Sequence, residues 1–380
     1  MLIYRTLVNL LQELSQRHLQ QILYMKNSIA FVIGIFFLSF STSLLYSQPG
    51  ADSLLNFIKQ NKSRSSLFLK KNDTVIAKLE ENRLMPLAST VKIMVAIEFA
   101  KQSAHDIFNE SKKIPLSELA KYYIPNTDGD AHPAWLNYER KLGHMANDSV
   151  KLIDVARGMI MFSSNANTEY LMDLLGFDNV KNNIRLLGLK QHTLIYPLVA
   201  SLFLYQNPKN ANDDKILKEI KNLSNEEYAK AAIFIHNALK NDTTYKKKFR
   251  PQDLTIKMQK EWSERLPAST TKEYVQVCSI LNNRKYFDEN TYRILADVLE
   301  TLMEKPANKT WLTHAGMKGG STIFVLTKAL YATLKNGTKI EMAYFFNDLT
   351  GEENHRLQSW MNDFEIQVLS NEDFRKKIIL

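Results

Sequence analysis

Strand patterns lie near both ends of the chain and enclose residues 105–304, which read mainly as helix. Towards the N-terminus, short apolar runs at residues 66–70 and 74–78 are separated by a polar turn, which indicates a hairpin. Towards the C-terminus, two longer apolar runs flank Asn336-Gly337, the strongest short hairpin signal. A single sheet that uses these strands must join the two ends of the chain, and this requirement constrains the fold more than any other feature.

The predicted fold class is α/β of the α+β type, with a mainly antiparallel sheet flanked by helices. Residues 48–104 and 305–380 are expected to form the sheet lobe, and residues 105–304 an all-helical lobe inserted into it. Within that lobe, residues 207–266 are polar and rich in lysine and asparagine, and we expect a helical insertion there. The C-terminal strands are expected at residues 312–318, 322–334 and 339–346, followed by a helix over residues 352–368.

Residues 25–47 have the composition of a secretory signal peptide. Lys26 is followed by an apolar run over residues 29–38 and then by small residues, with a cleavage position near Ser47. The alternative is an uncleaved membrane anchor, because the apolar segment has a borderline length for a membrane span. We expect export to the periplasm or the extracellular space, with translation starting at Met25 and residues 1–24 as an upstream extension.

The positive charge of the chain does not indicate a nucleic-acid partner. The formal net charge is +9, but only the stretch from Lys246 to Arg250 concentrates it, and such a run is typical of a solvated face. Cys278 is the only cysteine, which excludes an intramolecular disulfide, and its apolar surroundings predict a buried thiol. Since the histidines show no metal-ligand spacing, we expect no metal and no other cofactor.

Two serine–x–x–lysine patterns occur, at Ser89–Lys92 and at Ser269–Lys272. A serine hydroxyl needs an adjacent base to act as a nucleophile, and residues three apart on a helix share one face. A lysine amine can be that base when burial or positive charge lowers its pKa. Ser89 opens a strongly apolar run that predicts a buried helix. The alternative to a catalytic role for Ser89 is that it only caps the N-terminus of this helix. In the second pattern Thr270 begins a capping-box sequence, which predicts only a helix start.

Two further motifs follow Ser89–Lys92 in the chain. Ser163-Ser164-Asn165 separates two helical patterns, and Lys318-Gly319-Gly320-Ser321 ends a predicted strand. Serine–x–x–lysine, serine–x–asparagine and lysine–x–glycine, in this order, form the motif set of class A β-lactamases and penicillin-binding proteins. The chain resembles the class A β-lactamase group over most of residues 48–380, and the resemblance implies the β-lactamase/transpeptidase fold.

The resemblance implies catalytic roles for three residues. Ser89 attacks an amide carbonyl and forms an acyl-enzyme, and Lys92 takes the proton of its hydroxyl. Ser163 relays a proton to the leaving nitrogen. The backbone amides of Ser89 and Ser321 form the oxyanion hole.

The same resemblance implies four substrate-binding residues. Asn165 is expected to bind the amide side chain of the substrate, and Lys318 to face both Ser163 and a substrate carboxylate. Gly320 and Ser321 are expected to complete the binding strand.

The chain departs from the family pattern in two places. Gly319 replaces a residue that usually carries a hydroxyl, and Ser321 is expected to supply that hydroxyl two positions later. Class A enzymes use a glutamate after the second motif to activate the water that hydrolyses the acyl-enzyme, yet no glutamate occurs from residue 193 until Glu219. Glu169, four residues after Asn165, is a candidate for this base. The alternative is a glutamate in a first helical turn that is either exposed to solvent or placed there by the helix dipole.

The predicted function is that of an exported serine hydrolase of the class A β-lactamase type, acting as a monomer on a β-lactam or a related amide. The first alternative is a carboxypeptidase or transpeptidase that acts on a peptidoglycan stem peptide. The second is a non-catalytic penicillin- or peptide-binding module. We expect no nucleic-acid partner, and membrane contact only through the N-terminal segment.

Two remaining features carry no expected function. Residues 126–130 begin like a calcium-binding loop, but Gly129 is misplaced and Asn137 stands where the bidentate glutamate is needed, so we predict a turn. Trp135 and Tyr138 precede the second motif, and packing is favoured over a role in a cleft wall.

Overall fold

The structure is a computed structural model that describes residues 49–206 and 212–378. The expected signal peptide at residues 25–47 and the upstream extension at residues 1–24 lie outside the described residues. Within the described ranges, no helix combines the length and the apolar character needed to cross a membrane.

One five-stranded antiparallel sheet is built from both ends of the chain, in the order β2-β1-β9-β8-β7. Strand β1 pairs with β9, with Leu67 opposite Tyr344, although the two residues are far apart in the sequence. The predicted fold class is confirmed. The strands are β1 (Ser65–Lys71), β2 (Thr74–Leu79), β7 (Leu312–Ser321), β8 (Leu326–Leu334) and β9 (Lys339–Phe346).

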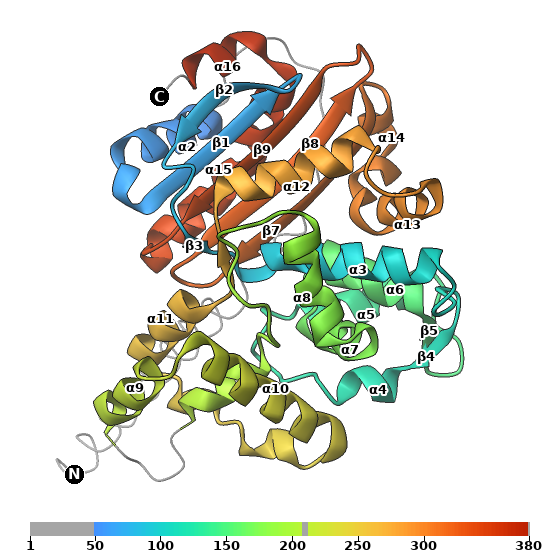
Figure 1. Cartoon of the computed structure of the whole chain (residues 1–380), viewed down its shortest axis with the longest axis vertical. Helices are drawn as coiled ribbons and strands as arrows, with labels where there is room; N and C mark the ends of the chain where they lie inside the picture. Colours follow the sequence, from blue (N-terminus) through green and yellow to red (C-terminus); the bar gives the residue numbers. More distant parts are fainter. Residues whose placement is uncertain (1–48, 207–211, 379–380) are drawn as a thin grey trace, which may run out of the picture.

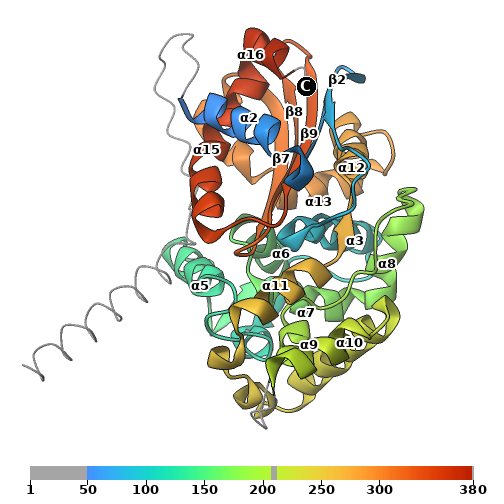
Figure 2. The same cartoon turned by 90° about the vertical axis from the view of Figure 1, so that its left-hand side faces the viewer.

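The sheet has an apolar core on each face, because successive strand residues point to opposite sides. On β9, Met342 and Tyr344 pack with α2 and α15, whereas Ala343 and Phe345 belong to the core on the α12 side. Figure 2 shows α2 and α15 on one side of the sheet and α12 on the other. The bounds of these helices are α2 (Pro49–Gln60), α12 (Thr271–Asn283) and α15 (Gly351–Ser370), and the short α16 (Glu372–Lys377) follows α15.

A helical lobe lies below the sheet in Figure 1, and α3 (Lys92–Ala104) lies at the side of this lobe that is nearest the sheet. Ten of the thirteen residues of α3 are buried, as the apolar run predicted, and Lys92 and Glu98 are the charged residues among them. A short pair of strands, β4 (Lys113–Pro115) and β5 (Ser149–Lys151), was not predicted. The other helices of this lobe are α4 (Leu116–Ala120), α5 (Ala131–Lys141), α6 (Leu152–Met161), α7 (Asn165–Leu175), α8 (Phe177–Leu186) and α13 (Glu289–Leu299). The short α14 (Pro306–Lys309) lies beside β7.

Residues 194–267 leave the lobe and return to the same point. At the base, Thr193 N donates to Ala268 O (2.8 Å), and β3 (Met85–Pro86) pairs with β6 (Ala268–Ser269). The described residues of the expected insertion at 207–266 are mainly helical, as predicted. The whole segment contains α9 (Asp213–Lys221), α10 (Asn225–Asn241), α11 (Ile256–Arg265) and the 3-10 turns η3 (Ala200–Tyr205), η4 (Tyr245–Lys248) and η5 (Pro251–Asp253).

Strand β7 continues through the lysine–x–glycine motif, which corrects the predicted strand end at Lys318. Gly319 and Gly320 lie opposite Lys328 and Thr327, and the β7–β8 turn is formed by residues 322–325. The two glycines can remain in the ladder because their backbone groups pair normally despite the missing side chains. The motif therefore lies inside an ordered strand and not on a mobile turn.

The second serine–x–x–lysine pattern is a helix start, as predicted. Thr270 is the N-cap of α12 and accepts a hydrogen bond from the Glu273 amide (3.1 Å). Ser269 lies in β6 and donates to the Glu273 carboxylate (2.6 Å), so the capping box is only half formed. Lys272 is exposed.

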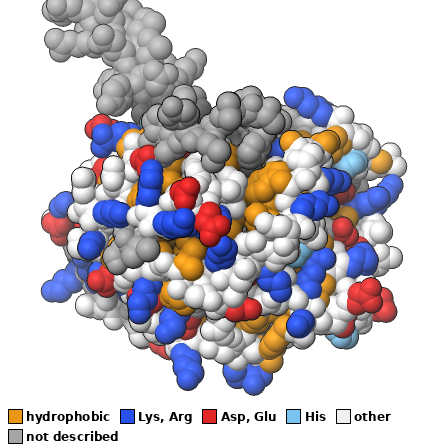
Figure 3. Space-filling view, turned by 90° about the horizontal axis from the view of Figure 1, so that it is seen from above, with side chains coloured by type: hydrophobic (Ala, Val, Ile, Leu, Met, Phe, Trp, Pro, Cys, Tyr) orange, Lys and Arg blue, Asp and Glu red, His pale blue; other side chains and the backbone are white. Residues whose placement is uncertain are grey.

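Other structural expectations are confirmed. Cys278 and Trp135 are buried in the apolar core, and Lys247 and Lys248 of the basic run are exposed. Figure 3 shows Lys and Arg side chains scattered among Asp and Glu over the upper face of the molecule. That face therefore does not gather positive charge into one patch.

Candidate active site

Ser89 lies on a tight turn that the surrounding fold holds in a strained conformation. It belongs to the 3-10 turn η2 (Ala88–Val91), which leads directly into α3. Ala88 has a φ of +44°, in the left-handed region that residues with a side chain rarely adopt. In the described chain neither η2 nor α3 begins with a side-chain cap, so Ser89 is not an N-cap. Strain of this kind is concentrated at functional sites.

The glycine at position 320 allows β7 to lie directly against this turn. A Cβ atom on Gly320 would be 2.4 Å from Ser89 N and 2.5 Å from Leu87 O, so a side chain would force the strand away. Thr327 on β8 donates to the Leu87 carbonyl (2.8 Å), and its hydroxyl is 2.8 Å from that of Thr90. The edge formed by β7 and β8 therefore fixes the backbone of Ser89.

Lys92 is a fully buried lysine whose amine contacts the second motif. Its Nζ donates to the Ser163 carbonyl (2.6 Å) and to Asn165 Oδ1 (2.8 Å), and it is 3.3 Å from Ser163 Oγ. Burial lowers the pKa of Lys92 to about 7, although the negative charges of Asp128 and Glu169 oppose the shift. A substantial fraction of this amine is neutral near neutral pH, and a neutral amine can accept a proton.

Ser163 connects Lys92 to a second buried lysine. The Nζ atom of Lys318 on β7 donates to Ser163 Oγ (3.0 Å), and Ser163 itself has a φ of +67°. Burial, assisted by the positive charges of Lys92 and Lys328, holds the pKa of Lys318 well below its usual range. The structure thus joins Lys92, Ser163, Asn165 and Lys318 by direct hydrogen bonds, and Ser89 lies one helical turn before Lys92.

Asp128 is an acidic residue near this site that the sequence analysis missed. Its Oδ2 accepts a hydrogen bond from the His132 amide (3.1 Å), whereas Oδ1 is buried and has no hydrogen-bond partner among the described residues. Burial raises the pKa of Asp128, and the charge of Lys92 opposes the shift. The preceding Thr127 accepts a hydrogen bond from Asn165 Nδ2 (3.4 Å), which ties this turn to the second motif.

Glu169, the candidate base for deacylation, supports the segment of residues 194–267. Its side chain is buried, and Oε1 accepts hydrogen bonds from the amides of Val199 (2.8 Å) and Ala200 (3.2 Å). Oε2 is 2.6 Å from His236 Nδ1. Both oxygens are therefore occupied, which is the arrangement of a loop anchor and not that of a base with an oxygen free for water. The alternative of an exposed glutamate is wrong.

His236 on α10 completes this anchor. It is fully buried, it stacks on Tyr122 with ring centroids 4.7 Å apart, and its Nε2 is 3.6 Å from Asp173 Oδ1. Burial acts to lower the pKa of His236, but the hydrogen bonds and charges of Asp173 and Glu169 outweigh burial and raise it to about 9. The imidazolium therefore pairs with Glu169 at neutral pH and holds α10 against α7.

The hydroxyl of Ser321 does not face the candidate site, so it does not replace the hydroxyl that the family usually has at the position of Gly319. Since Gly320 faces Ser89, its neighbours in the strand face the opposite side of the sheet. The Ser321 hydroxyl accordingly lies 3.5 Å from Asn354 Oδ1 and 3.4 Å from Gln358 Nε2, both on α15. The part of Ser321 that remains available to the site is its backbone amide.

An antiparallel sheet from both chain ends, an inserted helical lobe, and a polar centre where they meet define a protein of the β-lactamase/transpeptidase fold. A model of the beta-lactamase enzyme family matches residues 50–281, which is more than half of the chain. The chain belongs to this family.

Solved structures agree with this fold. A beta-lactamase from Sphaerobacter thermophilus is 16% identical, with 84% of this chain and 97% of that chain covered and a TM-score of 0.51. The TLA-3 extended-spectrum beta-lactamase is 14% identical, with 85% and 100% covered and a TM-score of 0.50. At these identities the similarity shows the fold alone. The comparison with curated proteins found no match.

The His236 anchor predicts a pH-dependent stability difference. In His236→Gln, the carboxylates of Glu169 and Asp173 lose their buried cation, and we expect a loss of about 3 kcal/mol in the free energy of unfolding. Because folding raises the pKa of His236 from 6.5 to about 9, the difference from wild type is complete below pH 6.5. The pH-dependent part of this difference is lost as the pH rises through 9, whereas the cost of replacing the buried, stacked imidazole remains. Urea unfolding between pH 6 and 10 measures it.

His105→Gln is the matched control, because His105 is exposed at the end of α3. We expect it to change the free energy of unfolding by no more than about 0.5 kcal/mol at every pH. A His236→Gln loss that does not vary between pH 6 and 10 would contradict the charged anchor.

Proposed function

We propose that this protein is a serine hydrolase that cleaves an amide through an acyl-enzyme on Ser89, with Lys92 as the base. The observation that carries the proposal is the buried amine of Lys92, which lies one turn after Ser89. This amine contacts Ser163, and its pKa is lowered to about 7. The first proposed substrate class is the β-lactams, which is consistent with the family of the chain. Such a role fits an exported protein, as expected from residues 25–47.

In the proposed acylation, the Ser89 oxygen attacks the amide carbonyl carbon and its proton moves to Lys92 Nζ. The backbone amides of Ser89 and Ser321 stabilise the negative oxygen of the tetrahedral intermediate, which is favoured by the close approach of Gly320 to Ser89 N. The C–N bond then breaks, and the leaving nitrogen takes the proton of the Ser163 hydroxyl. Ser163 recovers a proton from Lys92, so the acyl-enzyme forms with no net change in protons.

The hydrogen bonds of Lys92 favour its action as a base. A neutral amine has two N–H groups and one lone pair. The two shortest bonds, to the Ser163 carbonyl and Asn165 Oδ1, use both N–H groups. The lone pair is then left for a serine proton. Lys318 donates to the Ser163 oxygen, which leaves the Ser163 hydroxyl proton for transfer.

The binding residues keep the capacity that the proposal requires. Asn165 Nδ2 has two N–H groups, and its bond to the Thr127 carbonyl uses one of them. The second can donate to a carbonyl of the substrate. Lys318 places a buried amine beside Ser163. A substrate carboxylate bound there would favour the charged form of this amine and pair with it.

The occupied carboxylate of Glu169 favours a second candidate function. When no carboxylate activates water, the acyl-enzyme on Ser89 persists and can be transferred or slowly hydrolysed. This behaviour is characteristic of a penicillin-binding carboxypeptidase or transpeptidase that acts on a peptidoglycan stem peptide. The third possibility, a non-catalytic binding module, is tested by the labelling experiment described next.

Labelling with a fluorescent penicillin tests the proposal. We expect one adduct per wild-type molecule and none on Ser89→Ala, because the hydroxyl at position 89 is the attacking group. Hydrolysis of a chromogenic cephalosporin, measured in parallel, distinguishes the substrate classes. Rapid turnover supports a β-lactamase, and a persistent adduct supports the stem-peptide enzyme.

Ser269→Ala is the matched control, since it removes the serine of the other serine–x–x–lysine pattern. We expect it to be labelled like the wild type, provided that circular dichroism shows it to be folded. Absence of labelling in the wild type, or equal labelling of Ser89→Ala, would rule out Ser89 acylation by a β-lactam.

The charge of Asp128 predicts a shift in the pH dependence of acylation. Its negative charge favours protonated Lys92, so Asp128→Asn lowers the pKa of Lys92 below the wild-type value of about 7. Acylation requires the neutral amine, so its rate rises with pH through that pKa. We expect the midpoint of the rise to move to lower pH by about one unit in Asp128→Asn. Rates of penicillin labelling between pH 5 and 9 measure this shift.

Asp130→Asn is the control for this experiment. Asp130 belongs to the same turn, and its charge acts on the pKa of Asp128 but not directly on that of Lys92. Its midpoint is expected to remain near 7. An unchanged midpoint in Asp128→Asn would mean that this carboxylate does not influence the base.

A further inference from the structure

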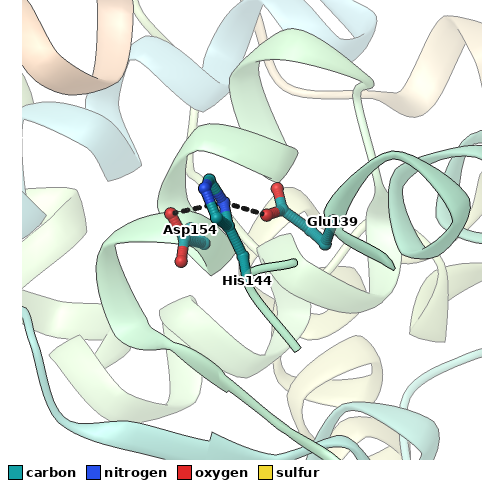
Figure 4. A group of neighbouring side chains, drawn as sticks. All are labelled: Glu139, His144 and Asp154. Carbon is teal, nitrogen blue, oxygen red and sulfur yellow. Dashed lines mark hydrogen bonds and ion pairs between the residues drawn. The ribbon is translucent and has the colours of Figure 1, made fainter. Parts of the chain in front are cut away.

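Three side chains that can bind a metal ion converge outside the candidate active site. Glu139 on α5, His144 in the following loop and Asp154 on α6 point toward one another, with His144 between the two carboxylates (Figure 4). His144 Nδ1 is 2.8 Å from Glu139 Oε2 and 3.9 Å from Asp154 Oδ1. We propose that this cluster binds a first-row divalent cation, with Zn²⁺ as the probe. The site is independent of the function proposed above.

The spacing of the three ligand atoms suits such an ion. Ligands about 2.1 Å from a tetrahedral Zn²⁺ are about 3.4 Å from one another. The ligand atoms of the cluster all lie within 4.8 Å of one another, and the two measured separations bracket the required value. Small side-chain rotations therefore complete the coordination without a change in the backbone. One imidazole nitrogen and two carboxylate oxygens form a ligand set that first-row divalent metals accept.

The charge of the cluster is poorly balanced by the protein. The side chains of Glu139 and Asp154 are only 3% and 9% exposed, and burial raises the pKa of both carboxyl groups. The charges of His144, Arg157 and Lys151 act on Asp154, but Arg157 is also paired with Glu304, and His144 has to be neutral to bind a metal. Buried carboxylates require a cation or a proton, and a divalent ion between these two would neutralise both.

Asp154 provides a second observation that points to a ligand. Its carboxylate is more than nine-tenths buried, and the 3.9 Å contact with His144 is longer than a hydrogen bond. The Lys151 backbone and nearby positive charges hold back the rise of its pKa without abolishing it. Figure 4 shows this carboxylate directed at the imidazole from the side opposite Glu139.

The surroundings would orient the ligands and admit the ion. Glu139 Oε1 accepts a hydrogen bond from the buried Trp135 Nε1 (3.0 Å), which leaves Oε2 directed at His144. Outer contacts of this kind commonly fix the orientation of metal ligands. His144 is 44% exposed, so the cluster can be reached from solvent.

Cation binding would fasten α5 to the start of α6 near the active site. Trp135 also packs on His132, with ring centroids 5.4 Å apart, and His132 Nδ1 is 2.9 Å from the Ser164 hydroxyl. Ser164 is the central residue of the second motif. The role assigned to the ion is thus structural, and stability is its direct readout.

The test is the melting temperature of the full chain, freed of metal with EDTA, before and after addition of ZnCl₂. At a concentration about 100 times the dissociation constant, we expect the wild-type melting temperature to rise by about 5 °C. His144→Ala and Asp154→Asn each remove one ligand, and neither is expected to show the rise. Co²⁺ provides a second readout, because its visible absorption reports the ligand geometry.

His105→Ala, which removes an exposed histidine at the end of α3, is expected to retain the full rise. Because the test compares each variant with and without metal, a change in basal stability does not obscure the result. The proposal is overturned if the wild-type melting temperature does not change, or if both ligand variants retain the rise.

Discussion

The rest of the candidate site depends on the burial of the Lys92 amine. A charged amine inside a protein is costly, and Lys92 has two oxygen acceptors in place of water, the Ser163 carbonyl and Asn165 Oδ1. Asp128 and Glu169 supply negative charge without reversing the effect of burial. The same burial that disfavours the charged form therefore lowers the pKa to about 7 and makes the lysine suitable as a base.

This environment is assembled from segments far apart in the chain. Strand β7 comes from the C-terminal part of the sheet, and Gly320 lets it touch the Ser89 turn that begins α3. Ser163 comes from the junction of α6 and α7 and lies between Lys92 and Lys318. Two non-glycine residues at positive φ, Ala88 and Ser163, are held in place by this three-way contact. Pairing between the two ends of the chain is thus a requirement of the chemistry as well as of the fold.

Much of this arrangement is local enough to predict from the sequence. Strand periodicity and ordered motifs identify the sheet from both ends and the residues that meet at Lys92. The side of a strand that a hydroxyl faces depends on register, which is why the expected role of the Ser321 hydroxyl was wrong. Asp128 lies in an ordinary turn, and only tertiary packing brings its charge to bear on Lys92. Glu169 contacts His236, which lies in the inserted segment. The sequence does not indicate how that segment folds back on α7, so this contact could not be predicted.

The most direct test of the account is an NMR titration of the Lys92 side chain. Lysine labelled with ¹³C at Cε reports the protonation of each amine, and the spectrum of Lys92→Ala assigns the signal. The account predicts a midpoint near pH 7, because burial disfavours the charged form. A midpoint that stays near the ordinary lysine value of 10.5 would show that Lys92 remains charged at neutral pH. That result would contradict its role as the base for Ser89.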